Sequence, residues 1–238
     1  AVTSTLGALT GYPVVAINMP IRQEPSQYSR SDAHIAWLQQ KFPNVNGITL
    51  DLNDPFTGFE RTLSNVRVSE LAFANLRSRL RMCALYSIAN TLNYLVLGTG
   101  NKVEDYGIGF FTKYGDGGVD VSPIADLLKS EVYELASYLG VIEDIQKAKP
   151  TDGLWNDNRG DEDQIGATYD ELEWALKFKD DKKSKAKSNI SFTDRQREVF
   201  DIYMTRHLTT KHKLEVPPTC YISEDIKREL VEDDTEDM

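Results

Sequence analysis

Residues 93–120 read NYLVLGTGNKVEDYGIGFFTKYGDGGVD, and this stretch decides the fold. A short apolar run, Tyr94–Leu97, stops at Gly98-Thr99-Gly100, and a helical pattern opens at Asn101 with Glu104 three residues later. The pattern predicts a strand, a tight turn and a helix. In open parallel sheets such a junction faces the crevice beyond the carboxyl ends of the strands, where glycines and helix amides meet anionic groups. We therefore expect a ligand that contains phosphate.

The glycine-rich segment that follows, Lys113–Gly118, carries charges of both signs. Such a composition suits a loop that closes over a ligand, although its glycines could merely permit a turn. The Gly-Thr-Gly turn is moderately specific, and Asn101 with Glu104 is equally a helix N-cap arrangement. The segment suggests an enzyme without identifying its reaction.

Composition narrows the class of protein. The 238 residues fit one large domain, and no apolar run approaches the roughly 20 residues that span a bilayer. The formal net charge of −10 argues against non-specific nucleic-acid binding, while local lysines and arginines could still bind an anionic nucleotide. Only Cys83 and Cys220 are present, which makes a disulfide framework or a zinc site unexpected and favours the cytoplasm.

The remaining pattern predicts a doubly wound α/β fold with a mostly parallel sheet and helices on both faces. Tyr12–Pro20 and Asn46–Leu52 are predicted strands, and Ser31–Phe42 is a predicted helix capped by Ser31. The polar residues 21–30 are predicted as a loop. Further helices are expected from Ser122-Pro123 to just before Gly140, over 169–178 and over 192–208, with a charged linker at 179–188 and an acidic, disordered tail at 224–238.

The longest predicted helix runs over about Val66–Asn93. Its apolar residues recur at helical spacing and predict a buried stripe, formed by Ala72, Leu76, Leu80 and Cys83. At 100° per residue Arg79 projects at the margin of that stripe, whereas Arg77 and Arg81 point away from it. Arg79 is thus the arginine expected at an interface or cleft, and a salt-bridged surface arginine remains the alternative.

The stretch LGTGNKVEDYGIGFFTKYGDGGVDVSPIADLLKSEVYELA, residues 97–136, closely resembles the NAD synthetase family. These amidotransferase-type ATP pyrophosphatases make NAD from deamido-NAD, and the resemblance runs from residue 1 to about Thr219. It implies a single ATP-pyrophosphatase domain over 1–238. It also implies a central strand and a Ser-Gly-Gly-x-Asp-Ser pyrophosphate loop before residue 1, because Ala1–Gly11 looks like the helix that would follow them.

The resemblance assigns roles to particular residues. Lys129 and Asp116 would be catalytic, with Asp116 positioning or deprotonating ammonia, and Glu104 would bind Mg²⁺. Thr99, Lys129 and Thr151 would bind ATP. Deamido-NAD would contact Arg79, Lys113, Asp120, His212 and Lys213. The residues alone leave other interpretations open: Lys129 could pair with Glu131 or face solvent, and the Lys-His-Lys run at 211–213 could be a solvated helix end.

Three hypotheses about function follow. The first is an ammonia-dependent NAD synthetase, a homodimer that forms an acyl adenylate from ATP and deamido-NAD. The second is another adenylating N-type ATP pyrophosphatase, against which the FFTKYGDGG loop argues. The third is a catalytically silent nucleotide-binding paralogue, and the lack of a Ser-Gly-Gly-x-Asp-Ser motif within these 238 residues leaves it open.

Overall fold

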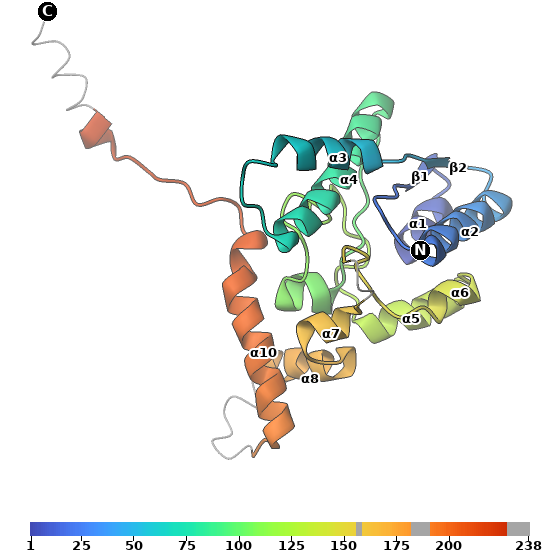
Figure 1. Ribbon diagram of the computed structural model, residues 1–238. Helices are drawn as coiled ribbons and strands as arrows, with labels where there is room; N and C mark the ends of the chain where they lie inside the picture. Colours follow the sequence, from blue (N-terminus) through green and yellow to red (C-terminus); the bar gives the residue numbers. More distant parts are fainter. Residues whose placement is uncertain (156–158, 182–190, 228–238) are drawn as a thin grey trace, which may run out of the picture.

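A computed structural model describes residues 1–155, 159–181 and 191–227 of the chain (Figure 1). The helices and strands, in chain order, are α1 (Val2–Leu9), β1 (Val14–Asn18), α2 (Pro25–Lys41), β2 (Val45–Thr49), α3 (Asn53–Thr62), α4 (Glu70–Leu92), η1 (Lys102–Ile108), α5 (Lys129–Tyr138), α6 (Glu143–Gln146), α7 (Asp161–Ile165), α8 (Tyr169–Asp180), α10 (Asp194–Thr210) and η2 (Lys211–Lys213). None of the described helices is both long and apolar enough to cross a membrane.

The two predicted strands form and pair in parallel. β1 and β2 align from Val14 opposite Val45 to Asn18 opposite Thr49. Their β-branched residues suit a pleated, half-buried surface, and α2 packs on both strands. This pairing confirms the predicted α/β class with parallel strands. It also places the carboxyl end of β1, at Asn18, on the side where a ligand crevice is expected.

The expected loop over residues 21–30 is wrong in its second half. α2 begins at Pro25, because Glu24 is extended and Pro25 supplies the fixed φ of a first helical position. Ser31 therefore lies within the helix and does not cap it. The helix ends at Lys41, as expected from the pattern.

The predicted strand at Tyr94–Leu97 is reduced to one parallel bridge, between Leu97 and Val121. The Gly98 amide donates to the Val121 carbonyl at 2.7 Å, which completes that contact. The Val96 amide instead donates to the Asp120 carboxylate at 2.8 Å. A side chain thus occupies a position that a neighbouring strand would fill, which limits the ladder here.

The long helix α4 forms as predicted, capped by the Ser69 hydroxyl and ended by Asn93 in the left-handed conformation. The predicted inward stripe is wrong. Ala72 and Cys83 are exposed, and the buried residues of α4 are Ala74, Arg77, Ser78 and Ala89. The expected orientation of the arginines is wrong as well: Arg77 is buried and Arg81 lines a cavity, whereas Arg79 is exposed.

The helix expected from Ser122 begins later, at Lys129. Residues 122–128 form turns instead, and the Leu127 carbonyl accepts a hydrogen bond from the Lys102 amide at 2.9 Å. Leu128 is extended, and its amide donates to the Glu131 carboxylate at 2.7 Å. These two contacts draw the segment toward η1 and away from a helical path.

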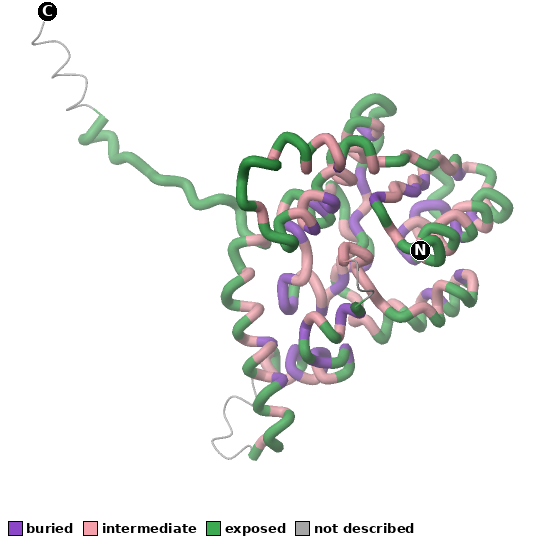
Figure 2. The backbone as a smooth tube through the Cα atoms, in the orientation of Figure 1, coloured by how far each residue is buried: buried purple, intermediate pink, exposed green. Residues whose placement is uncertain are grey.

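The core is divided among three clusters. The largest joins η1, α8 and α10 around Val103, Leu172 and Tyr203. A second joins α1 to α5, and a third joins α1, α2 and the two strands. Figure 2 shows the buried segments between these elements, whereas residues 214–227 are exposed and extend away from the body. Residues 224–227, the described part of the tail predicted to be disordered, form a helical turn instead. The rest of that tail and most of the predicted linker lie outside the described residues.

Candidate active site

The turn at Gly98–Asn101 organises the site. Asn101 accepts hydrogen bonds from the amides of Val103 and Glu104, both at 3.0 Å, and so confirms the predicted N-cap. The helix that it caps is η1, a π-helix, a rare form that occurs frequently at functional sites. Gly100 is required by close packing, since a Cβ there would lie 1.8 Å from the Asp105 carboxylate.

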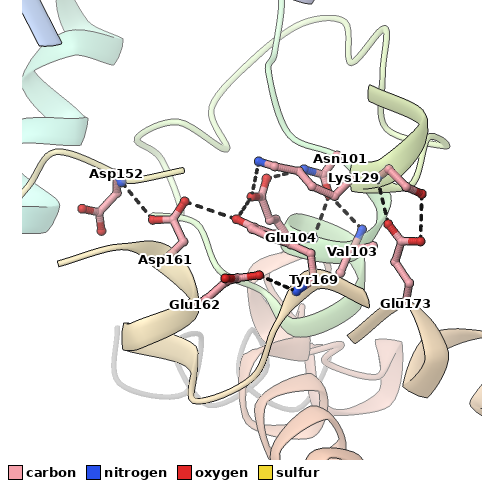
Figure 3. Close-up of polar contacts among 10 residues, drawn as sticks. Asn101, Val103, Glu104, Lys129, Asp152, Asp161, Glu162, Tyr169 and Glu173 are labelled. Atoms are coloured by element: carbon pink, nitrogen blue, oxygen red, sulfur yellow. Dashed lines mark hydrogen bonds and ion pairs between the residues drawn. The ribbon is translucent and has the colours of Figure 1, made fainter. Parts of the chain in front are cut away.

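Glu104 is the centre of a polar cluster (Figure 3). Its Oε1 accepts from Lys129 Nζ at 2.8 Å and from the Tyr169 hydroxyl, and its Oε2 accepts from the side-chain Nδ2 of Asn101. The Lys129 ammonium also lies 4.7 Å from the centre of the Tyr169 ring. The side chains of Lys129 and Glu104 are only 17% and 14% exposed, so their attraction is weakly screened. Lys129 therefore pairs with Glu104, 25 residues earlier in the sequence, and not with Glu131.

Asp161 joins this cluster through Tyr169. The Tyr169 hydroxyl lies 3.2 Å from Asp161 Oδ2, and the amide of Asp152 donates to Asp161 Oδ1 at 2.9 Å. Burial, followed by the negative charge of Glu104, raises the pKa of Asp161 to about 6. The hydroxyl of Tyr169 thus contacts two carboxylates, and the Lys129 ammonium binds one of them.

The predicted ATP-binding residues share one cavity. Thr99, Lys129 and Thr151 line a hollow of about 360 Å³, here called the Lys129 cavity. The Thr151 hydroxyl donates to the Arg159 carbonyl at 3.0 Å, which fixes the irregular segment that follows Pro150. Residues from segments far apart in the sequence therefore converge at the place where the turn was expected to bind phosphate.

A second and larger hollow adjoins the first. This Asp116 cavity, of about 840 Å³, is lined by Asp116, Lys213 and Thr99, and Thr99 also lines the Lys129 cavity. Asp116 Oδ1 accepts from the Ser78 hydroxyl at 2.6 Å and from the Thr112 amide at 3.0 Å. The glycine-rich loop is thereby fastened to α4.

Lys213 supplies a cation to the same cavity. Its Nζ donates to the carbonyls of Gly109 and Phe111, at 2.8 and 2.7 Å. Burial lowers the pKa of Lys213, while Asp116 and Asp105 favour its charged form. The end of η2 is thus tied to the segment that leads into the glycine-rich loop.

The other residues predicted to bind the dinucleotide line neither cavity in this chain. Lys113 Nζ donates to the carbonyls of His212 and Glu215, and Arg79 Nη2 donates to the Lys113 carbonyl at 3.4 Å. These contacts bring Arg79, Lys113 and His212 together outside the cavities. Asp120 lies apart from them, accepting from the Tyr86 hydroxyl at 3.0 Å and from the Val96 amide.

Glu104 is also the predicted Mg²⁺ ligand. Within the described ranges, no group of three or more His, Cys, Asp or Glu side chains is placed to hold a metal ion. Mg²⁺ commonly takes one or two carboxylates and completes its shell with water and substrate phosphates. A single carboxylate beside the Lys129 cavity fits that kind of site, with the difference that Lys129 and Tyr169 both donate to its Oε1 and the Asn101 side chain donates to its Oε2.

Sequence reasoning missed three residues. Tyr169 and Asp161 belong to the Glu104 cluster, but they come from segments some 60 residues further along the chain, and their types carry no motif. The third is Asp105, whose pKa is raised to about 8 by burial and by the charges of Asp116 and Glu104. Only its position beside Glu104 could have drawn attention to it.

Comparison with known proteins agrees with this geometry. The NAD synthase family model matches residues 3–217. The NH(3)-dependent NAD(+) synthetase of Carboxydothermus hydrogenoformans is 46% identical over 136 residues, which are 56% of this chain and 55% of that protein. The match thus spans little more than half the length of that relative.

Two further relatives match over most of the chain. The NH(3)-dependent NAD(+) synthetase of Syntrophomonas wolfei subsp. wolfei is 35% identical over 225 residues, 92% of this chain and 83% of that protein. The solved structure of NMN synthetase from Francisella tularensis has a TM-score of 0.77 and 28% identity, covering 93% of this chain and 84% of that one. With a family match over residues 3–217 and a parallel α/β fold shared with that structure, the chain belongs to the NAD synthase family.

Proposed function

We propose that this protein amidates deamido-NAD with ammonia at the expense of ATP, releasing NAD, AMP and pyrophosphate. One observation carries the proposal: Thr99, Lys129 and Thr151 line one cavity, and Thr99 is shared with the neighbouring Asp116 cavity. Two adjoining hollows suit two nucleotides whose reacting groups meet between them. Two of the matched relatives are named NH(3)-dependent NAD(+) synthetases, which supports this assignment.

The first step is the activation of a carboxylate, which is a poor acyl donor. An oxygen of the pyridine carboxylate attacks the α-phosphorus of ATP, the bond to the bridging oxygen breaks, and pyrophosphate leaves. Lys129 holds phosphate oxygens in this step, and a shielded ammonium stabilises their growing charge well. A Mg²⁺ ion bound by Glu104 and the phosphates would neutralise further charge.

The second step forms the amide. The nitrogen of ammonia attacks the carbonyl carbon of the acyl adenylate, the bond to the AMP oxygen breaks, and a proton leaves the nitrogen. Asp116 lies on the wall of its cavity with Oδ1 held by Ser78 and Thr112, so its other oxygen can receive that proton. The proposed role of Asp116 is therefore to position ammonia and accept its proton.

Deamido-NAD is assigned to Arg79, Lys113, Asp120, His212 and Lys213. Lys213 lines the Asp116 cavity, whereas Arg79, Lys113 and His212 gather outside it. The assignment of these outer residues rests on the protein being a homodimer whose second copy lies against them. We place the protein in the cytoplasm, because Cys83 and Cys220 are both free thiols and suit a reducing compartment.

One assay tests the proposal. The complete protein is incubated with ATP, Mg²⁺, ammonium and deamido-NAD, and the products are separated by chromatography. We expect NAD, AMP and pyrophosphate in equal amounts. Formation of ADP, or no turnover, would remove the hypothesis.

A second substrate belongs in the same assay. The Francisella tularensis structure of similar fold is that of an NMN synthetase, so nicotinic acid mononucleotide is supplied in parallel. If kcat/KM is higher for the mononucleotide than for deamido-NAD, the mononucleotide is the preferred substrate of the same amidation.

A further inference from the structure

Arg81 projects from the inward side of α4 toward the carboxyl end of β1. Its Nε donates to the Met19 carbonyl at 3.0 Å. Its two terminal nitrogens make no hydrogen bond or ion pair with the described residues. A guanidinium presents five N–H donors, so most of its capacity is unused here.

A second cation lies one helical turn earlier. Arg77 is buried, its Nη1 donates to the Leu154 carbonyl, and its Nε has no partner within the described part of the chain. Its guanidinium lies 4.8 Å from the centre of the Phe56 ring. Burial, and then the charge of Arg77, lowers the pKa of Arg81 to about 10. Two like charges are therefore held together with only carbonyl oxygens and a ring as partners.

The acidic groups near Arg81, Asp116 and Asp152, form hydrogen bonds with other residues and no ion pair with Arg81. Asp116 Oδ1 accepts from Ser78 and Thr112. Asp152 accepts from the backbone amide of Leu154 at 3.0 Å and from the side-chain Nε2 of Gln164 at 3.2 Å. Their charges favour protonated Arg81 without forming an ion pair with it. A shielded cation without a paired anion is unfavourable, and a bound anion would relieve that cost.

The position of Arg81 gives it access to two hollows. It lines the Asp116 cavity and also a smaller one of about 260 Å³, here called the Asn18 cavity, at the carboxyl end of β1. Met19 and Asp152 line both hollows as well, so these three residues form the partition between them. An anion held on this partition could belong to a molecule in either hollow.

We propose that Arg81 forms an anion-binding subsite, which holds phosphate or carboxylate oxygens of a substrate where the Asp116 cavity meets the Asn18 cavity. The identity of the bound substrate rests on the proposed function. ATP would supply phosphate oxygens to this subsite, and deamido-NAD would supply a carboxylate or a diphosphate. The planar guanidinium fork suits two such oxygens at once.

The subsite is distinct from the position of Arg79. Arg79 is exposed and contacts the Lys113 carbonyl, whereas Arg81 lies 200° further round the same helix and faces the cavities. Substitutions of Arg79 and of Arg81 should therefore remove different contacts.

Arg81→Gln tests the subsite, with Arg67→Gln as the control that removes an equal charge from an exposed position. Calorimetric titrations with ATP alone and deamido-NAD alone are combined with steady-state kinetics and thermal unfolding. We expect Arg81→Gln to weaken the binding of one substrate at least tenfold, with Arg81→Lys intermediate and Arg67→Gln unchanged. Weaker ATP binding identifies a phosphate of ATP, and weaker deamido-NAD binding identifies the acid dinucleotide. Changes below twofold for both substrates would overturn the proposal.

Two further measurements keep the test decisive. If Arg81→Gln does not fold, Arg81→Lys is compared with the wild type in its thermal stabilisation by inorganic pyrophosphate; equal stabilisation would overturn the subsite, and a smaller rise in Tm supports it. If the wild type makes no NAD, the proposed function fails by itself. The pyrophosphate measurement still decides whether Arg81 binds an anion.

Discussion

Lys129 is fixed by distant residues, and this arrangement sets what its removal should do. Its ammonium is shared between the Glu104 carboxylate and the Tyr169 ring, and it lines the cavity assigned to ATP. We expect Lys129→Ala to lower kcat by at least about 100-fold, because one shielded charge contributes several kcal/mol to a phosphoryl transition state. The fold should persist, since Asn101 and Tyr169 still donate to Glu104.

Lys147→Ala is the matched control, because Lys147 forms an exposed ion pair with Glu143 on α6. Kinetic assays and circular dichroism measure both variants. Wild-type kinetics in Lys129→Ala would refute the role assigned to Lys129.

Gly100 offers a second test at the scale of one residue. A Cβ at this position would lie 1.8 Å from the Asp105 carboxylate, so Gly100→Ala must displace Asp105 or the turn. We expect a loss of about 1–3 kcal/mol in the free energy of unfolding, as for other overpacked sites. Gly58→Ala is the control: Gly58 lies within α3 with open space around it, and alanine there should stabilise by about 0.5–1 kcal/mol. Urea unfolding of both variants measures the contrast, and equal effects would contradict it.

At the scale of elements, Ser78 couples α4 to the glycine-rich loop. Its hydroxyl donates to Asp116 Oδ1 at 2.6 Å and accepts from the Asp116 amide at 2.8 Å. Ser78→Ala removes both hydrogen bonds. The free energy that holds the loop in place should fall by about 1–3 kcal/mol, which should lower kcat/KM by about tenfold or more. Ser87→Ala on the same helix removes only a local bond to the Cys83 carbonyl and should leave kcat/KM unchanged. A similar kcat/KM in both variants would show that Ser78 does not position Asp116.

The stability of the contact between α8 and α10 should depend on pH. Arg195 binds both carboxylate oxygens of Glu171 at 2.7 Å, and this hydrogen bonding lowers the pKa of Glu171 to about 2. Because the folded pKa lies below the unfolded value near 4.5, the stabilisation is present above pH 4.5 and is lost as pH falls toward 2. We expect Glu171→Gln to lower Tm at pH 7 by a few degrees and to reduce the loss of stability below pH 4.5. Since Arg195 is half exposed, solvent screens the pair and the effect should be small. Thermal unfolding at pH 7, 4 and 2.5 measures it, and parallel curves for both proteins would contradict it.

For the whole molecule, local patterns predicted elements better than they predicted packing. β1, β2, α4, α8 and α10 follow from their apolar periodicity and caps. The late start of α5 could not be predicted, because the contact between Lys102 and the Leu127 carbonyl is non-local. For the same reason the sequence pointed to Thr99 and Lys129 by resemblance, but not to Tyr169 or Asp161.

The apolar stripe of α4 gives the last prediction. Ala72, Leu76, Leu80 and Cys83 recur at helical spacing, yet Ala72 and Cys83 are exposed, because α4 turns its arginine side to the cavities. An apolar stripe that the single chain leaves partly exposed suits a second copy related by two-fold symmetry. We expect a dimer at micromolar concentration, and Cys83→Glu should shift it toward monomer by placing a charge in the interface. Cys220→Glu, in the exposed tail, should leave it a dimer. Sedimentation equilibrium of the three proteins decides: a monomeric wild type, or equal association of both variants, would show that this face of α4 is not the contact between copies.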